Sequence, residues 1–128
     1  MEFKQSKTIS LQIAETICEN ILQDSWVSGD RIPSVREYAA SIEVNPNTIV
    51  RSYSYLEELE IISKKRGIGY FVNKDAKKLI LRKRKNEFIE NQLPDFFKSV
   101  DLLNIEWEEI TNKYTLHKTR EHDKKNEN

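Results

Sequence analysis

Apolar residues recur at every fourth position near the start of the chain. The members of this series are Ile9, Ile13, Ile17 and Ile21. The spacing predicts a helix from about Ile9 to Gln23 with one apolar face. Cys18 lies within this face and is predicted to be a small buried hydrophobe. Asp24 to Asp30 is predicted to be a loop, with Trp26 packed against the core.

Two shorter helices are predicted after this loop. Ser34 and Glu37 match the capping-box pattern S-x-x-E, in which a hydroxyl and a carboxylate each bond a free amide at a helix start. Asn45 is a preferred N-cap residue, and Pro46 suits the first helical position because an amide hydrogen is not needed there. The third helix then runs to about Glu60, with an inward face of Ile49, Ser52, Tyr53 and Leu56.

The segment after the third helix, IISKKRGIGYFV, is predicted to form a β-hairpin. Two short runs of β-branched and aromatic residues flank a turn that contains Gly67 and Gly69. Three helices closed by a two-stranded hairpin make a winged helix-turn-helix. The predicted fold class is therefore mainly α, with residues 1–73 as one winged helix-turn-helix domain.

The remaining residues predict a small helical segment. The sequence Leu93-Pro94-Asp95 predicts a break, because proline disfavours a helical residue before it. One helix is expected around residues 96–103 and another around 105–114. Residues 74–116 are thus predicted to be helical, and the polar residues 117–128 to be a disordered tail.

Composition favours a soluble globular protein, with 33% charged and 38% hydrophobic residues. No run approaches the roughly 18 apolar residues of a membrane span, and the first residues lack the apolar core of a secretory signal. A cytoplasmic, nucleoid-associated location is therefore predicted, with no membrane partner. The formal net charge is zero, yet residues 74–92 carry seven Lys or Arg against three Asp or Glu. The basic run from Arg82 to Lys85 fits either a solvated helix face or a DNA clamp.

In a helix-turn-helix, the second helix of the pair enters the major groove. The residues at the start of this helix are therefore candidates for contacts with bases and phosphates. The Asn47 side chain is suited to hydrogen bonding with the edge of an adenine. Thr48 could contact a phosphate or a thymine methyl group, and Arg51 could contact a guanine or a phosphate. Arg36 on the preceding helix is placed to bind a phosphate or a base. Asn45 is either a capping residue alone or a DNA contact in addition to its capping role. For Asn47, Thr48 and Arg51 the alternative interpretation is an ordinary solvated helix face.

The hairpin adds a second candidate contact. A basic hairpin with glycine at its tip can lay its backbone against the minor groove. Its candidate residues are Lys65, Arg66 and Gly67, and the alternative is a tight turn with solvated cations.

The segment GDRIPSVREYA, the element VNPNT and the wing RGIGYFV occur in order over residues 9–73. In these motifs the chain resembles the DNA-binding domain of the GntR family of bacterial transcription regulators. The resemblance implies that Arg36, Asn47, Thr48 and Arg51 contact an operator and that Gly67 touches the minor groove. Many members have arginine where this chain has Pro46, which shifts base readout toward the other residues.

About 55 residues follow the wing, which is similar to the short YtrA-type branch of the family. That resemblance implies a helical dimerisation segment and repression of operons that encode ABC-type transporters. The segment also has more large apolar residues than it can bury on itself, which favours a homodimer. The predicted interface is Phe88, Phe96, Phe97, Val100, Leu103, Trp107 and Ile110, and the alternative is that these residues cover the winged-helix core.

The predicted function is a sequence-specific DNA-binding regulator, a repressor that binds a palindromic operator as a homodimer. A two-fold dimer would place its recognition helices about 34 Å apart, or a multiple of that distance. The chain has no glycine-rich phosphate loop and no Cys or His cluster, so no enzyme activity, cofactor or metal site is expected. An effector stays unidentified. The alternative function is a winged-helix protein-interaction adaptor that does not bind DNA.

Overall fold

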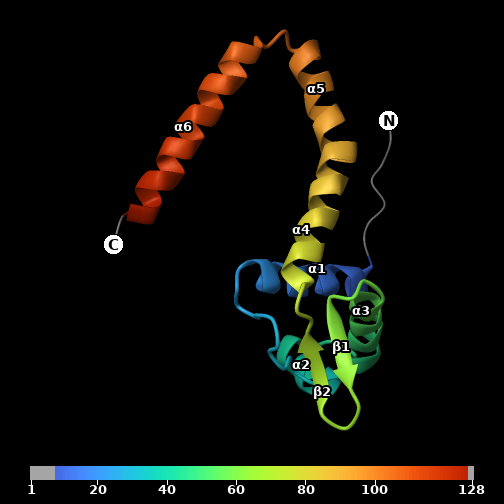
Figure 1. Cartoon of the computed structure of the whole chain (residues 1–128). Helices are drawn as coiled ribbons and strands as arrows, with labels where there is room; N and C mark the ends of the chain where they lie inside the picture. The colour runs from blue at the N-terminus through green and yellow to red at the C-terminus, as the bar shows by residue number, and fades with distance from the viewer. Residues whose placement is uncertain (1–7, 127–128) are drawn as a thin grey trace. The chain divides into compact units, whose positions relative to one another are not determined.

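The structure is a computed structural model and describes residues 8–126 of the chain. It divides into two compact units between Arg84 and Lys85. The first unit holds three helices, a hairpin and most of the helix that follows the hairpin (Figure 1). The second holds the helices that follow. None of the helices in the described part of the chain is long and apolar enough to cross a membrane.

Three helices of the first unit begin where the sequence predicts, and the second and third begin at their predicted capping residues. The three helices are α1 (Ile9–Leu22), α2 (Val35–Ile42) and α3 (Pro46–Glu58). The Ser34 hydroxyl accepts a hydrogen bond from the Glu37 amide at 3.1 Å, and the Glu37 carboxylate accepts one from the Ser34 amide at 3.3 Å. The capping box is therefore confirmed, and α3 begins at Pro46 as predicted.

The wing is an antiparallel hairpin of β1 (Ile62–Lys65) and β2 (Gly69–Val72), in which Ile62 pairs with Val72. The segment before α2 adds a third, short partner. Arg31 forms a β-bridge with Phe71, and the Ile32 amide donates to the Tyr70 carbonyl at 2.9 Å. The hairpin is thereby tied to the segment that leads into α2.

One hydrophobic core holds the first unit together. It contains α1 residues such as Ile17, α3 residues such as Tyr53 and Leu56, and Ile62 of the wing. Cys18 is buried among them, as predicted, and this burial raises the pKa of its thiol to about 11. Trp26 packs against the same core, which confirms its predicted position.

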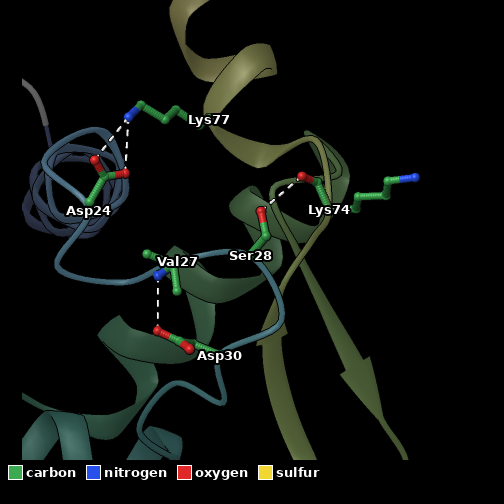
Figure 2. Close-up of polar contacts among 6 residues, drawn as sticks. All are labelled: Asp24, Val27, Ser28, Asp30, Lys74 and Lys77. Atoms are coloured by element: carbon green, nitrogen blue, oxygen red, sulfur yellow. Dashed lines mark hydrogen bonds and ion pairs between the residues drawn. The ribbon is translucent and has the colours of Figure 1, made fainter.

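The loop between α1 and α2 is bonded to the residues that follow the wing (Figure 2). The Ser28 hydroxyl donates to the Lys74 carbonyl at 2.9 Å, and the Lys77 ammonium lies 3.0 Å from an Asp24 carboxylate oxygen. The next helix, α4 (Ala76–Glu87), buries Ala76 and Ile80 in the core described above. The compact unit therefore extends to Arg84, past the predicted boundary at residue 73, because apolar side chains of α4 complete its core.

The second unit differs from the sequence prediction at Pro94. A π-helical turn, η1 (Phe88–Gln92), leads directly into α5 (Leu93–Leu102), so the predicted break at residues 93–95 is wrong. Pro94 lies in the first turn of α5, where its missing amide hydrogen is tolerated. The Leu93 amide donates to the Phe88 carbonyl, which is the wider hydrogen-bond spacing of a π turn.

The last helix, α6 (Trp107–Asn126), corrects the predicted disorder of residues 117–128 as far as the described residues extend. Residues 117–126 are helical although their side chains are exposed. Five of these ten residues are lysine, arginine or glutamate, which favour helix. The polar side chains therefore prevent a buried core without removing the helical preference. Residues 127 and 128 lie outside the described part of the chain.

Candidate nucleic-acid interface

Asn45 holds the start of α3. Its side-chain oxygen accepts a hydrogen bond from the Asn47 amide at 2.8 Å, and its backbone carbonyl accepts one from the Thr48 amide at 2.9 Å. Pro46 takes the next position, where no amide hydrogen is required. The capping role of Asn45 is thus present in the structure. The exposed side chain of Asn47 is left on the first turn of the helix.

Two buried hydroxyl groups fix the orientation of α3. The Ser52 hydroxyl donates to the Ser10 carbonyl at 2.6 Å, and the Tyr53 hydroxyl donates to the Pro33 carbonyl at 2.7 Å. Both residues have no exposed surface. The inward face predicted from the sequence is confirmed, and the opposite face presents Asn47 and Arg51 to solvent. Thr48 is partly buried.

Arg36 lies in the first turn of α2, beside the capping box, and is exposed. The hydrogen bonds between Ser34 and Glu37 hold the pKa of the Glu37 carboxyl below its usual value, and the positive charge of Arg31 acts in the same direction. The carboxylate therefore stays ionised at neutral pH. The starts of α2 and α3, in the same domain, thus carry the four predicted groups Arg36, Asn47, Thr48 and Arg51.

The wing carries its cations next to aromatic rings. The Lys64 ammonium lies 5.7 Å from the centroid of the Tyr70 ring, and that of Lys65 lies 4.5 Å from the Phe71 ring. Gly67 has φ +77°, a left-handed conformation that favours glycine, at the tip of the hairpin. Arg66 is exposed beside it, so the predicted basic wing is present with its glycine at the turn.

Arg31 is a candidate that the prediction from sequence missed. A Cβ atom added to Gly69 would lie 2.9 Å from the Arg31 Nε, so the guanidinium group rests against the backbone of the wing. Its position in the motif GDRIP marks it in the sequence, but only the β-bridge to Phe71 brings it to the hairpin. Arg31 thus adds a cation to the wing from a distant point in the chain.

Exposed apolar residues of the first unit were also missed. Val50 on α3 is 47% exposed, and Ile68 at the tip of the wing is 58% exposed. Each is next in the chain to a residue that the sequence predicts to contact DNA, Arg51 for Val50 and Gly67 for Ile68. A pattern of apolar positions cannot find them, because such a pattern assigns valine and isoleucine to the core.

The second unit carries the residues predicted to form a dimer interface. Phe88, Phe96, Phe97, Leu103 and Trp107 are exposed, Ile110 is partly buried, and Val100 is buried within the chain. The rings of Phe97 on α5 and Trp107 on α6 have centroids 6.2 Å apart. With Val100, Asp101 and Ile105 they line an open hollow of about 460 Å³. Most of the predicted set therefore lies on the surface of this unit.

The model of the bacterial regulatory proteins of the gntR family matches residues 9–72, the stretch that contains α1 to α3 and the wing. The chain belongs to the GntR family. It is similar to the HTH-type transcriptional regulator YhcF of Bacillus subtilis, with 38% identity over 85% of this chain and 88% of YhcF. It is also similar to the HTH-type transcriptional repressor YtrA of the same organism, with 33% identity over 84% of this chain and 82% of YtrA.

A solved structure of a GntR-family transcriptional regulator from Bacteroides thetaiotaomicron has the same fold. It is 44% identical, with a TM-score of 0.77 over 89% of this chain and 99% of that one. This GntR-family chain is therefore a DNA-binding transcriptional regulator and not an enzyme. Within residues 8–126, no group of three or more His, Cys, Asp or Glu side chains is arranged to hold a metal ion.

Proposed function

We propose that this GntR-family chain is a homodimeric repressor that binds a palindromic operator. The main support is the exposed face of α3, where Asn47 and Arg51 stand opposite a fully buried face. Two buried hydroxyl bonds hold the helix in one orientation. A helix fixed in this way can present hydrogen-bonding groups to base edges without reorganising on binding.

In this proposal Arg36 and Thr48 bind phosphates or base edges beside the recognition helix, and the wing binds the adjacent minor groove. Lys65 and Arg66 supply the positive charge there, and Gly67 permits the backbone to approach closely. Arg31 adds a phosphate contact from its position beside Gly69 on the wing. Asn45 acts first as a cap, and its side chain is next to the same groove.

The exposed aromatic residues of the second unit support the homodimer. Phe96, Phe97 and Trp107 are 40%, 44% and 56% exposed, and large apolar side chains gathered in this way mark an interaction surface. A two-fold dimer matches a palindromic site, because each subunit reads one half of it. An effector that acts at this interface would change the spacing of the two recognition helices.

The name of YtrA, a transcriptional repressor, supports repression as the sign of regulation. Following the YtrA-type resemblance, we propose that the regulated operon encodes an ABC-type transporter and that the chain acts on DNA in the cytoplasm. Selection of genomic fragments by the purified protein tests this directly. Fragments from promoters of other kinds of operon would contradict the proposed target.

Arg51→Ala tests the recognition surface. Removal of a guanidinium group that contacts a base or a phosphate is expected to weaken operator binding by roughly 1–3 kcal/mol, which is about 5- to 150-fold. The measurement is an electrophoretic shift titration at several salt concentrations. Arg120→Ala on α6 is the matched control, because it removes an exposed arginine from the other unit. Equal affinities for wild type and Arg51→Ala would contradict the assignment of α3, and binding that does not change with salt would favour the adaptor function.

A further inference from the structure

We propose that Val50 reads the 5-methyl group of a thymine in each operator half-site. This inference rests on the proposed binding of α3 in the major groove. It adds a prediction about the operator sequence, namely a thymine at a defined position in each half-site. Val50 becomes a specificity-determining residue rather than an ordinary surface residue.

The first observation is the position of Val50 on α3. Its side chain is 47% exposed, whereas Ile49 and Tyr53 on the same helix have no exposed surface. At about 100° per residue, Val50 lies about 60° from Asn47 around the helix axis, and about 60° from the buried Tyr53 on its other side. Val50 therefore borders the surface that Asn47 and Arg51 present to the groove.

The second observation is the chemistry of its neighbours. After the exposed Pro46 at the start of the helix, the other exposed residues on its first turns are Asn47, Arg51 and Ser54, and these three carry hydrogen-bonding groups. These groups match the nitrogen and oxygen atoms of base edges. The apolar feature of the major groove is the thymine methyl group, and a β-branched side chain complements it by excluding water from both surfaces.

Helix geometry predicts how far the thymine lies from the base that Asn47 contacts. Val50 follows Asn47 by three residues, which is about 4.5 Å along the helix axis. Successive base pairs are separated by about 3.4 Å. The thymine is therefore expected within one or two base pairs of the base that Asn47 contacts.

The test replaces thymine by deoxyuridine, which removes only the methyl group. Each thymine of a half-site recovered by genomic selection is replaced in turn, in both half-sites, and binding is measured for the wild type, Val50→Ala and Val50→Thr. One replacement is expected to weaken wild-type binding by about 3- to 10-fold, the effect of losing a buried methyl contact. The same replacement is expected to leave the affinity of Val50→Ala unchanged. Val50→Thr keeps one methyl group and the shape of valine, so it is expected to retain part of the sensitivity.

Val27→Ala is the matched control, because Val27 is also a half-exposed valine of the first unit, at 46%, but lies in the loop between α1 and α2. This variant is expected to keep the full sensitivity to deoxyuridine. If no replacement affects wild type and Val50→Ala differently, the inference is overturned while the proposed function stands. A protein that binds no genomic fragment overturns both. Melting temperatures of the variants establish that each is folded, and Val50→Thr alone decides the matter if Val50→Ala is not.

Discussion

Hydrogen bonds at single residues decide where α2 and α3 begin. Ser34 and Glu37 satisfy each other's backbone amides at the start of α2, and Asn45 satisfies the amide of Asn47 at the start of α3. Tyr53 is fully buried with its hydroxyl bonded to the Pro33 carbonyl, and burial raises the pKa of this phenol. Within the described residues, no buried side-chain nitrogen or oxygen lacks a hydrogen-bond partner. The polar groups of the core therefore orient α3 without leaving an uncompensated desolvation cost.

Glu37 predicts a stability change in acid. The pKa of this carboxyl is lowered in the folded state, chiefly by the hydrogen bonds with Ser34, so the ionised form stabilises the fold. That stabilisation is present above the ordinary value of 4.5 and is lost as the pH falls below it. Glu37→Gln keeps a capping box but cannot titrate, so its unfolding free energy is expected to change less steeply than that of the wild type between about pH 5 and 3. Urea denaturation at a series of pH values measures this, and identical pH profiles would exclude the contribution.

At the scale of elements, α4 is the helix that the sequence assigns to the wrong unit. Its basic run suggests an exposed helix, yet Ala76 and Ile80 are buried in the core of the first unit. Arg84 donates to the Glu15 carbonyl at 3.2 Å, which ties the same helix to α1. Of the basic run from Arg82 to Lys85, Arg84 thus has a structural role. The first turns of α4 close the domain that binds DNA.

Ile80→Ala tests this role of α4. Removing a fully packed isoleucine side chain is expected to lower the unfolding free energy by roughly 2–5 kcal/mol, because it leaves a cavity in the core. Urea denaturation followed by circular dichroism gives the value. Leu81→Ala is the control on the same helix, since Leu81 is 53% exposed, and its effect is expected to be within about 0.5 kcal/mol. A similar small effect for both variants would show that α4 does not complete the core.

At the scale of the whole molecule, the two units carry different kinds of surface. The first presents cations and hydrogen-bonding groups at the starts of α2 and α3 and on the wing. The second presents aromatic residues near the connection of α5 and α6, which diverge from that point in Figure 1. Charged groups suit phosphates, and exposed rings suit a protein partner. This division supports a regulator in which one unit binds DNA and the other binds a second copy of the chain.

Phe97→Asp and Trp107→Asp test the homodimer. A carboxylate placed among these rings would have to be buried without a partner, so each variant is expected to be monomeric at concentrations at which the wild type is a dimer. Sedimentation equilibrium measures the association, and operator affinity is expected to fall with it. Leu116→Asp is the control, because Leu116 is exposed and lies about 180° around α6 from Trp107. A dimer unchanged by either aromatic substitution would rule out this interface.

Local chemistry explains why much of the secondary structure of the first unit could be predicted from the sequence. Capping residues, helical spacing and a glycine turn each act within a few positions of the chain, so α1 to α3, the wing and the exposure of Asn47 and Arg51 follow from the sequence. The break predicted at Pro94 failed because a π turn accommodates the proline. The disorder predicted after residue 116 failed because helical preference does not need an apolar face.

The sequence by itself determined the family, the winged helix and the exposed face of α3, because those features depend on short-range patterns. Only the tertiary structure decided which residues from distant segments share a surface. It brought Arg31 to the wing beside Gly69, joined α4 to the first core and left Val50 exposed next to Asn47. Burial depends on what packs against a residue from elsewhere in the chain, and no local pattern contains that information.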